Sequence, residues 1–235
     1  MTPTTIECAF CGKALKARTK EFAGTEVYLG TEPCDCPESV ADRERIEREE
    51  RERMEANRKA LEERRLSKAG IPKRYRDCSH PKALSLAEAV KDGRWAYIHG
   101  GNGTLKSTLA YAVAAILLSQ GKRVRCMSSY DLMDAMRAPS EADRAMYDQA
   151  REVDFLILDD LGKEATASEY ACERLFSIID ARSKEMRPTV ITSNLKLSEL
   201  ANGIPVNGVG VAIASRIRED AAMVEMTGKD RRLAC

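Results

Sequence analysis

The sequence predicts an α/β fold, a parallel sheet with helices on both faces, joined to a charged helix and a small cysteine-rich module. Three features support this prediction. From about residue 95 onward short apolar runs alternate with helical segments, residues 38–68 are almost entirely charged, and half of the eight cysteines lie within the first 36 residues. A chain of 235 residues has room for one domain of ordinary size and a small appendage.

The composition argues against several classes of protein. The 38 Lys and Arg residues balance 37 Asp and Glu residues, so the net charge of +1 gives no global argument for nucleic-acid binding. No stretch approaches the roughly 18 apolar residues that a membrane-spanning helix needs. Residues 1–6 lack the basic and apolar regions of a signal peptide. We therefore expect a cytoplasmic protein without membrane contact, whose cysteines bind metal or remain buried thiols.

The N-terminal cysteines have the spacing of a structural metal site. Cys8 and Cys11 form a C-x-x-C pair, and Cys34 and Cys36 form a C-x-C pair further along the chain. Four thiolates are a typical ligand set of structural Zn²⁺, and a closed set leaves no position for catalysis. Free surface thiols or a redox pair are the alternatives. The other four cysteines are scattered and are expected to be small core residues: Cys78, Cys126, Cys172 and Cys235. Of these, Cys126 and Cys172 lie within apolar patterns.

Residues 38–68 are predicted to form one exposed helix. Acidic and basic residues recur at i, i+4, as in Glu44/Arg48 and Glu55/Lys59. The few apolar positions make a stripe too sparse for a coiled coil. The helix is interpreted as a solvated spacer that ends at residues 69–72, with a partner-binding or self-binding arm as the alternative.

Four strands are predicted in the remainder of the chain, separated by helices. The segment 153–158 is almost purely apolar, as expected for a strand buried on both faces of a parallel sheet. Short connections between strands and helices favour parallel strands. The other predicted strands are 95–99, 123–128 and 189–192, and the predicted helices are 107–120, 131–137 and 168–184.

A phosphate-binding loop is predicted between the first of these strands and its helix. Residues 100–107 match the pattern G-x-x-x-x-G-K-[ST] except that Leu105 precedes the lysine. In such a loop backbone N–H groups surround the β-phosphate, Lys106 reaches the β- and γ-phosphates, and Ser107 binds Mg²⁺. A turn that merely joins strand to helix is the alternative. The predicted nucleotide-binding residues are Gly100, Gly101, Asn102, Gly103, Thr104, Leu105, Lys106, Ser107, Thr108 and Asp159.

Leu105 is the one departure from the loop pattern. A glycine is usual there because the backbone approaches the phosphates closely, or because it needs dihedral freedom that a Cβ restricts. We therefore hypothesise that ATP hydrolysis is slow or impaired.

Acidic and amide side chains follow two of the predicted strands. Asp159 and Asp160 end the apolar run at 155–158, at the strand end where open α/β sheets bind their ligands. Asp159 is expected to orient the Mg²⁺ shell and Asp160 to polarise the attacking water. Asn194 follows the next strand and is expected to help place that water. Solvated turn residues are the alternative for both acids.

Together these segments resemble the DnaC/IstB-like branch of AAA+ ATPases, which includes bacterial and phage replicative helicase loaders. The resemblance covers roughly residues 66–235 and rests on the lead-in at 69–76, the paired aspartates and the segment 192–194. It implies a RecA-like AAA+ sheet without a separate helical lid over residues 69–235. Residues 1–37 then form a zinc-binding module like that of some loaders, and 38–68 a charged helical linker.

The resemblance also implies a role for each site residue. Lys106 and Ser107 correspond to Walker A, Asp159 and Asp160 to Walker B, and Asn194 to sensor 1. Arg216 matches an arginine finger that would enter a neighbouring subunit, with Arg218 as the alternative finger and an ordinary helix arginine as the other reading. The predicted catalytic residues are Lys106, Asp160, Asn194 and Arg216, and the predicted Mg²⁺ ligands are Ser107 and Asp159.

The implied function is that of an ATP-binding helicase loader with ATP or ADP, Mg²⁺ and Zn²⁺ as cofactors. Its implied partners are a hexameric replicative helicase, single-stranded DNA and further copies of itself. The alternatives are an IstB-like transposition helper, or a catalytically weak nucleotide-sensing adaptor. A local basic track is one route to DNA, although a solvated surface is the default reading: Lys73, Arg74, Arg76, Lys122 and Arg123.

Overall fold

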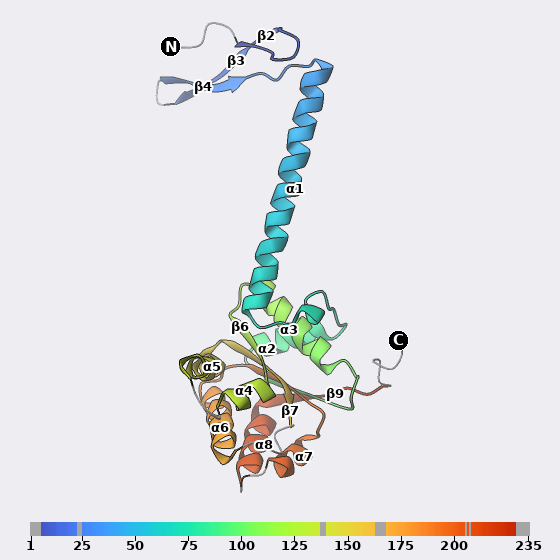
Figure 1. Cartoon of the computed structure of the whole chain (residues 1–235), viewed down its shortest axis with the longest axis vertical. Coiled ribbons are helices and arrows are strands. Elements are labelled where there is room, and N and C mark those ends of the chain that lie inside the picture. Colours follow the sequence, from blue (N-terminus) through green and yellow to red (C-terminus); the bar gives the residue numbers. More distant parts are fainter. Residues whose placement is uncertain are drawn as a thin grey trace. The chain divides into compact units, whose positions relative to one another are not determined.

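A computed structural model describes residues 6–22, 25–136, 140–162, 168–204, 206 and 208–228. The chain forms two compact units, residues 1–62 and 63–235, and each is described by itself. Figure 1 labels the helices and strands.

Two small antiparallel hairpins form the beginning of the first unit. Strand β1 (Ile6–Glu7) pairs with β2 (Ala14–Leu15), and β3 (Ala17–Phe22) pairs with β4 (Thr25–Thr31). None of these strands is predicted from the sequence. Every described residue of β3 is exposed, so the strand carries no alternation of buried and exposed side chains that a sequence pattern reveals.

Helix α1 (Pro37–Lys68) confirms the predicted charged helix. The expected pair Glu55/Lys59 forms an ion pair of 2.8 Å, and Arg45 lies 3.0 Å from Glu49. Such exposed pairs stabilise a helix by only about 0.3–0.5 kcal/mol each. Leu66, near the end of the helix, is its one buried residue. Just beyond the helix, Gly70 has φ +87°, and a Cβ there would lie 2.3 Å from the backbone oxygen of Cys126.

A five-stranded parallel sheet forms the centre of the second unit, in the order β6-β7-β8-β5-β9. The four predicted strands are confirmed, and β9 is a fifth that the sequence analysis missed. Residues of β9 are partly or fully exposed, so its sequence lacks the continuous apolar run of a buried strand. The strands are β5 (Trp95–His99), β6 (Val124–Ser128), β7 (Phe155–Leu161), β8 (Thr189–Ser193) and β9 (Ala221–Glu225).

Helices cover both faces of this sheet, as predicted (Figure 1). Side chains of β7 alternate between two buried clusters: Leu156 and Leu158 belong to one, Phe155 and Ile157 to the other. The first cluster includes residues of α4 (Ser129–Ala135), α5 (Glu141–Glu152), α6 (Glu169–Lys184), α7 (Leu197–Gly203) and α8 (Val209–Asp220). The second includes residues of α2 (Ala83–Lys91) and α3 (Lys106–Ser119).

Three of the scattered cysteines have a described environment. Cys126 and Cys172 are buried, which confirms them as small core residues, and Cys78 is half-buried. Cys235 lies outside the described residues. Within the described part of the chain, every helix is too short or too polar to cross a membrane.

A fully buried arginine ties together the ends of several elements. The guanidinium of Arg182 donates to the carbonyl oxygens of Ala150 at 3.0 Å, Val153 at 2.8 Å and Pro188 at 2.7 Å, and to the Thr189 hydroxyl at 2.8 Å. Burial lowers the pKa of Arg182. These hydrogen bonds fix the end of α5 and the starts of β7 and β8. The starts of these strands lie at the opposite end of the sheet from the phosphate-binding loop.

Candidate functional site

The predicted phosphate-binding loop connects the end of β5 to the first residue of α3. Lys106 is buried, and its ammonium group donates to the carbonyl oxygens of Gly100 at 2.9 Å and Gly101 at 2.7 Å. The Thr104 hydroxyl donates to the same Gly101 oxygen at 2.9 Å. The loop therefore curls around the lysine at a helix N-terminus, which is a favourable place for an anion.

Leu105 adopts the left-handed conformation, with φ 66° and ψ 25°. Of the two reasons for a glycine at this position, the structure supports the need for dihedral freedom. A side chain in this region costs roughly 1–2 kcal/mol relative to the right-handed conformation. Leu105 is therefore a strained residue within the loop.

Gly100 has a packing role rather than a place beside the ligand cavity. A Cβ on Gly100 would lie 2.1 Å from the Met226 backbone oxygen. The Met226 N–H donates to the His99 carbonyl oxygen at 2.7 Å. The glycine thus allows the segment after β9 to pass directly over the start of the loop.

Several of the predicted residues from separate strands surround one cavity of about 400 Å³. Its volume lies within the range of about 300–1,000 Å³ that is usual for small-molecule sites. Gly100, Gly101, Asn102 and Asp159 do not line it. The predicted residues that do are Gly103, Thr104, Leu105, Lys106, Ser107, Thr108, Asp160 and Asn194.

Asp159 lies next to Asp160 in the chain but does not line the cavity, and two hydroxyl groups hold its carboxylate. Thr192 donates to Asp159 Oδ1 at 2.5 Å, and Tyr111 donates to Oδ2 at 3.1 Å. From the sequence, Thr192 was noted only as part of the segment 192–194, and Tyr111 was not predicted. Both are separated from Asp159 by more than thirty residues, so no local pattern signals these contacts.

A break in strand pairing brings Asp160 to the cavity. The register of β7 with β8 shifts between Leu158 and Leu161, and Asp160 has φ 66°. Asp tolerates this left-handed conformation better than most residues. The Asp160 N–H donates to the Thr192 hydroxyl at 2.8 Å, and its carbonyl oxygen accepts from Ser129 at 2.9 Å. These side chains replace regular ladder bonds and fix the bulge.

Arg74 and Tyr75 also line the cavity, from the 3₁₀ turn η1 (Lys73–Tyr75). From the sequence, Arg74 was assigned to a possible DNA track, and Tyr75 had no assigned role. Tyr75 stacks on Tyr111, with ring centroids 4.7 Å apart. An aromatic residue beside an arginine in the segment 69–76 was the signal available in the sequence.

Arg216 does not line the cavity of its own chain. It lies on α8, partly exposed, and its guanidinium is 3.1 Å from Asp180 and 3.5 Å from Glu219. Lys184 and Arg216 lower the pKa of Asp180. Arg218 is exposed on the same helix. A role for either arginine in a neighbouring subunit stays a prediction.

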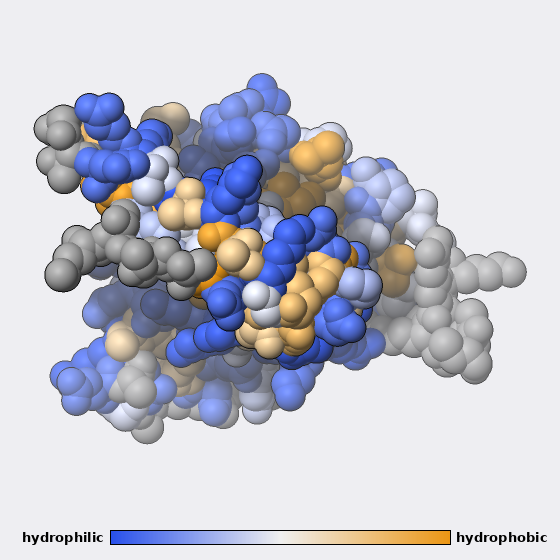
Figure 2. All heavy atoms as spheres, turned by 90° about the horizontal axis from the view of Figure 1, so that it is seen from above, coloured by the Kyte–Doolittle hydropathy of each residue, from blue (hydrophilic) through white to orange (hydrophobic). Residues whose placement is uncertain are grey.

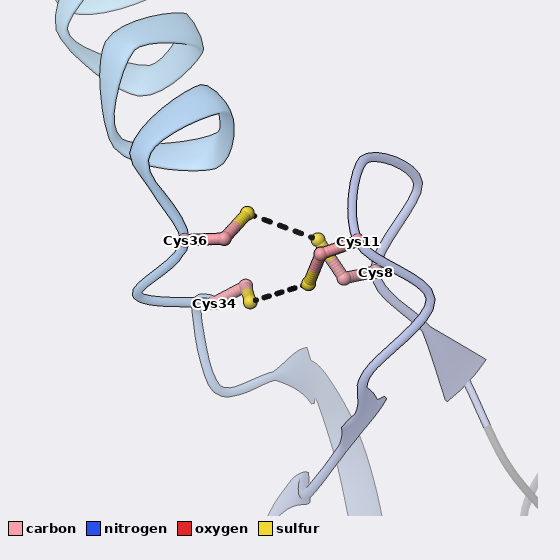
Figure 3. A group of neighbouring side chains, drawn as sticks. All are labelled: Cys8, Cys11, Cys34 and Cys36. Atoms are coloured by element: carbon pink, nitrogen blue, oxygen red, sulfur yellow. Dashed lines mark hydrogen bonds between the residues drawn. The ribbon is translucent and has the colours of Figure 1, made fainter.

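The four N-terminal cysteines form a cluster (Figure 3). Cys8 Sγ lies 3.8 Å from Cys36 Sγ, Cys11 Sγ lies 3.5 Å from Cys34 Sγ, and all four sulfurs lie within 4.8 Å of one another. Tetrahedral Zn²⁺ with Zn–S bonds of about 2.3 Å requires sulfur separations of about 3.8 Å. The cluster fits a four-thiolate zinc site.

Nearby groups shift the pKa values of the clustered thiols in opposite directions. Backbone N–H groups of Cys11 and Phe10 lower the pKa of Cys8 to about 6, whereas burial raises that of Cys36 to about 12. Cysteines bind Zn²⁺ as thiolates, and four neighbouring thiolates repel one another unless a cation lies between them. Arg43 of α1 donates to the Cys34 carbonyl oxygen at 2.7 Å and so fixes the second cysteine pair to the helix.

Comparisons with known sequences place the chain in a family. The family model described as "IstB-like ATP binding protein" matches residues 33–234, so Cys8 and Cys11 lie outside the match. Replicative helicase loader DnaC of Escherichia coli (strain K12) is 28% identical over 163 residues, 61% of this chain and 66% of DnaC. Uncharacterized protein YdaV of the same strain is 30% identical over 158 residues, 59% of this chain and 63% of YdaV. The chain thus spans just under two thirds of the length of these relatives.

Solved structures share the fold of the second unit. A crystal structure of DnaI superposes with a TM-score of 0.57 at 29% identity, covering 64% of this chain and 83% of DnaI. A crystal structure of the DnaC helicase loader gives 0.54 at 24% identity, covering 66% and 100%, and supports the fold alone. Since the family model spans most of the sequence, this chain belongs to the IstB-like ATP-binding protein family, with an AAA+ fold.

Proposed function

We propose that this protein is an ATP-binding helicase loader that binds a hexameric replicative helicase and assists its loading onto single-stranded DNA. The observation that carries this proposal is the meeting of Lys106, Ser107, Asp160 and Asn194 around one cavity. They come from the loop after β5 and the ends of β7 and β8. Similarity to the loader DnaC supports the choice of partner.

The proposed nucleotide site assigns a role to each residue at the cavity. Lys106 binds the β- and γ-phosphates, Ser107 is a ligand of Mg²⁺, and Asp159 orients the metal's shell from behind the wall. Asp160 polarises the attacking water, with Asn194 beside it. Bound Mg²⁺ supplies neutralisation of the charge that develops on the phosphates. The strained Leu105 supports slow turnover, which suits a switch.

The proposed helicase contact lies on the zinc-bearing unit. Hydrophobic residues there are strongly exposed: Phe10 at 52%, Phe22 at 58% and Leu29 at 55%. A hairpin of two strands has no face on which to bury such side chains. On the side of the protein shown in Figure 2, hydrophobic residues reach the surface between hydrophilic ones. Exposed apolar side chains beside a rigid metal site suit a protein partner.

Two of the five basic residues considered for DNA binding are engaged in ion pairs. Arg123 forms a bidentate ion pair with Asp154, with hydrogen bonds of 2.9 and 2.6 Å. Arg76 forms an ion pair with Glu63. Arg74 lines the nucleotide cavity. The proposed contact with single-stranded DNA therefore rests on similarity to helicase loaders rather than on a basic track.

A pull-down with the replicative helicase of the same cell, with and without ATP, tests the proposal. We expect a complex whose mass, measured by light scattering, exceeds that of the helicase hexamer. Lys106→Ala is expected to remove the effect of ATP, and Phe22→Ser to weaken the complex in both conditions. Surface variant Tyr130→Ser, an equally exposed aromatic residue on α4, is the control. Absence of a complex in both conditions contradicts the loader proposal.

Membership of the IstB-like ATP-binding protein family keeps a second candidate, an IstB-like transposition helper. Such a protein would bind duplex DNA and a transposase. ATP-dependent retention of duplex DNA without any helicase complex is the result that would select it.

A further inference from the structure

We propose that Tyr111 is a positioning residue that holds the Asp159 carboxylate for Mg²⁺ and links it to the cavity wall at Tyr75. The inference rests on the proposed nucleotide site and adds a residue that the loop motif does not contain. It predicts that the hydroxyl of Tyr111 acts on the Mg²⁺-dependent part of nucleotide binding.

The hydrogen bonds of Asp159 give the first reason. Its two carboxylate oxygens have separate donors, Thr192 on β8 and Tyr111 on α3. Neither Asp159 nor Tyr111 lines the cavity, whereas Asp160 does. The orientation of the Asp159 carboxylate is therefore set by two hydroxyl groups from different elements. Tyr111 precedes Asp159 in the chain, and Thr192 follows it.

The place of Tyr111 on its helix gives the second reason. Tyr111 follows Ser107 by four residues on α3, so the two side chains lie on the same face of the helix. The Tyr111 side chain is buried, and its hydroxyl donates to Asp159 Oδ2 at 3.1 Å. The phenol therefore reaches the carboxylate from the same helix that carries Ser107.

The stacked tyrosines give the third reason. The rings of Tyr111 and Tyr75 lie 4.7 Å apart with an interplanar angle of 27°. Tyr75 lines the cavity beside Arg74, and its turn follows the residues that end α1. The buried Tyr111 therefore contacts both Tyr75, which a bound nucleotide would touch, and Asp159, which a bound metal would approach.

Tyr111→Phe removes the donor and keeps the stacked ring. Outer-shell hydrogen bonds to metal ligands typically change metal affinity by about 10–100-fold. We expect the Mg²⁺ concentration needed to tighten ATP binding to rise by about tenfold. ATP affinity in EDTA should equal that of the wild type, since the loop is unchanged.

Tyr147→Phe is the matched control. Tyr147 is a buried tyrosine whose hydroxyl lies 3.0 Å from Ser177 Oγ, and it does not line the nucleotide cavity. Loss of the Tyr147 hydroxyl should leave the Mg²⁺ titration unchanged. The change in melting temperature should be small and similar to that of Tyr111→Phe. Tyr75→Leu, at a half-buried position, is the second variant and should raise the Mg²⁺ requirement in the same direction.

The titrations are measured on the full chain with a fluorescent ATP analogue, with Mg²⁺ and with EDTA. An unchanged Mg²⁺ requirement in Tyr111→Phe overturns the inference, as does an equal loss of affinity with and without Mg²⁺. Wild-type protein that binds no ATP would contradict the nucleotide site itself. Failure to bind a helicase, with the tyrosine effect present, would contradict only the loader proposal.

Discussion

The Thr192 hydroxyl donates to Asp159 Oδ1 at 2.5 Å and accepts the Asp160 N–H at 2.8 Å. One side chain on β8 therefore fixes the carboxylate of one acid and the backbone of the next. The chemistry proposed for this site depends on that division, because Asp159 stays behind the cavity wall and Asp160 reaches it.

Thr192→Val is expected to disturb both acids while keeping the shape of the side chain. It leaves a carboxylate oxygen and a backbone N–H without their partner, at a cost of about 1–3 kcal/mol in the free energy of unfolding. ATP turnover should fall as well. Chemical denaturation and a phosphate-release assay measure these effects. Thr192→Ser keeps the hydroxyl and should resemble the wild type, so equal losses in both variants would refute this role.

Leu105→Gly is expected to raise ATP affinity and turnover, because glycine adopts the left-handed conformation without the Cβ penalty. The free energy of unfolding should change by less than about 1 kcal/mol, since the greater freedom of glycine in the unfolded chain offsets the relieved strain. Leu105→Ala keeps the Cβ and should behave like the wild type. Equal ATP binding and hydrolysis by the glycine variant and the wild type would sink the hypothesis of an impaired loop.

Removal of zinc is expected to unfold the residues before α1. Among the described residues there, only Cys8 and Cys34 are buried, so the hairpins have little apolar core to stabilise them. Structural Zn²⁺ supplies folding free energy in such small units. Elemental analysis should give one zinc per chain, lost in Cys11→Ser and kept in Cys78→Ser. ATP affinity should survive chelation, and a metal-free wild-type chain with unchanged amide spectra would contradict the site.

Arg182→Met is expected to lower the free energy of unfolding by at least about 3 kcal/mol, because several buried carbonyl groups lose their donor. Arg187→Met is the control: Arg187 also donates to a carbonyl of α5, that of Arg151 at 2.9 Å, but from the surface. Its loss should cost less than about 1 kcal/mol. Similar midpoints for the two variants in urea would show that the buried network contributes little.

Arg216→Ala is expected to reduce ATP turnover of the assembled protein and to leave the ATP affinity of dilute protein unchanged. An arginine supplied by a neighbouring subunit contributes about 10³–10⁵ in rate where it stabilises the transition state. Arg218→Ala on the same helix is the comparison. Turnover that falls only in the Arg218 variant would assign the finger to that residue, and turnover unchanged in both would remove the finger altogether.

Buried strands were the part of the fold that the sequence predicted well. Apolar runs such as Phe155–Leu158 face helices on both sides, and their composition leaves little choice of structure. Strand β9 and the β3–β4 hairpin were missed because their side chains remain largely exposed. Their position depends on partners in the sheet or on the cysteine cluster, which a local pattern does not contain.

The candidate site was predictable where one loop carries it and not where distant segments meet. Lys106 and Ser107 follow from the spacing of the loop motif, and the structure places both at the cavity. Tyr111 and Tyr75 became visible only when α3, η1 and β7 were brought together. The absence of a glycine at position 105 was evident from the sequence. Only the backbone conformation of Leu105 shows that the position needs dihedral freedom.

Strand β5, which leads into the phosphate-binding loop, has both of its sheet neighbours far downstream, in β8 and β9. While the chain is being synthesised, this strand therefore emerges with both edges open. At about 5–20 residues per second, it waits on the order of ten seconds before β9 can pair with it. A nascent or prematurely ended chain cannot complete the loop's packing against Met226.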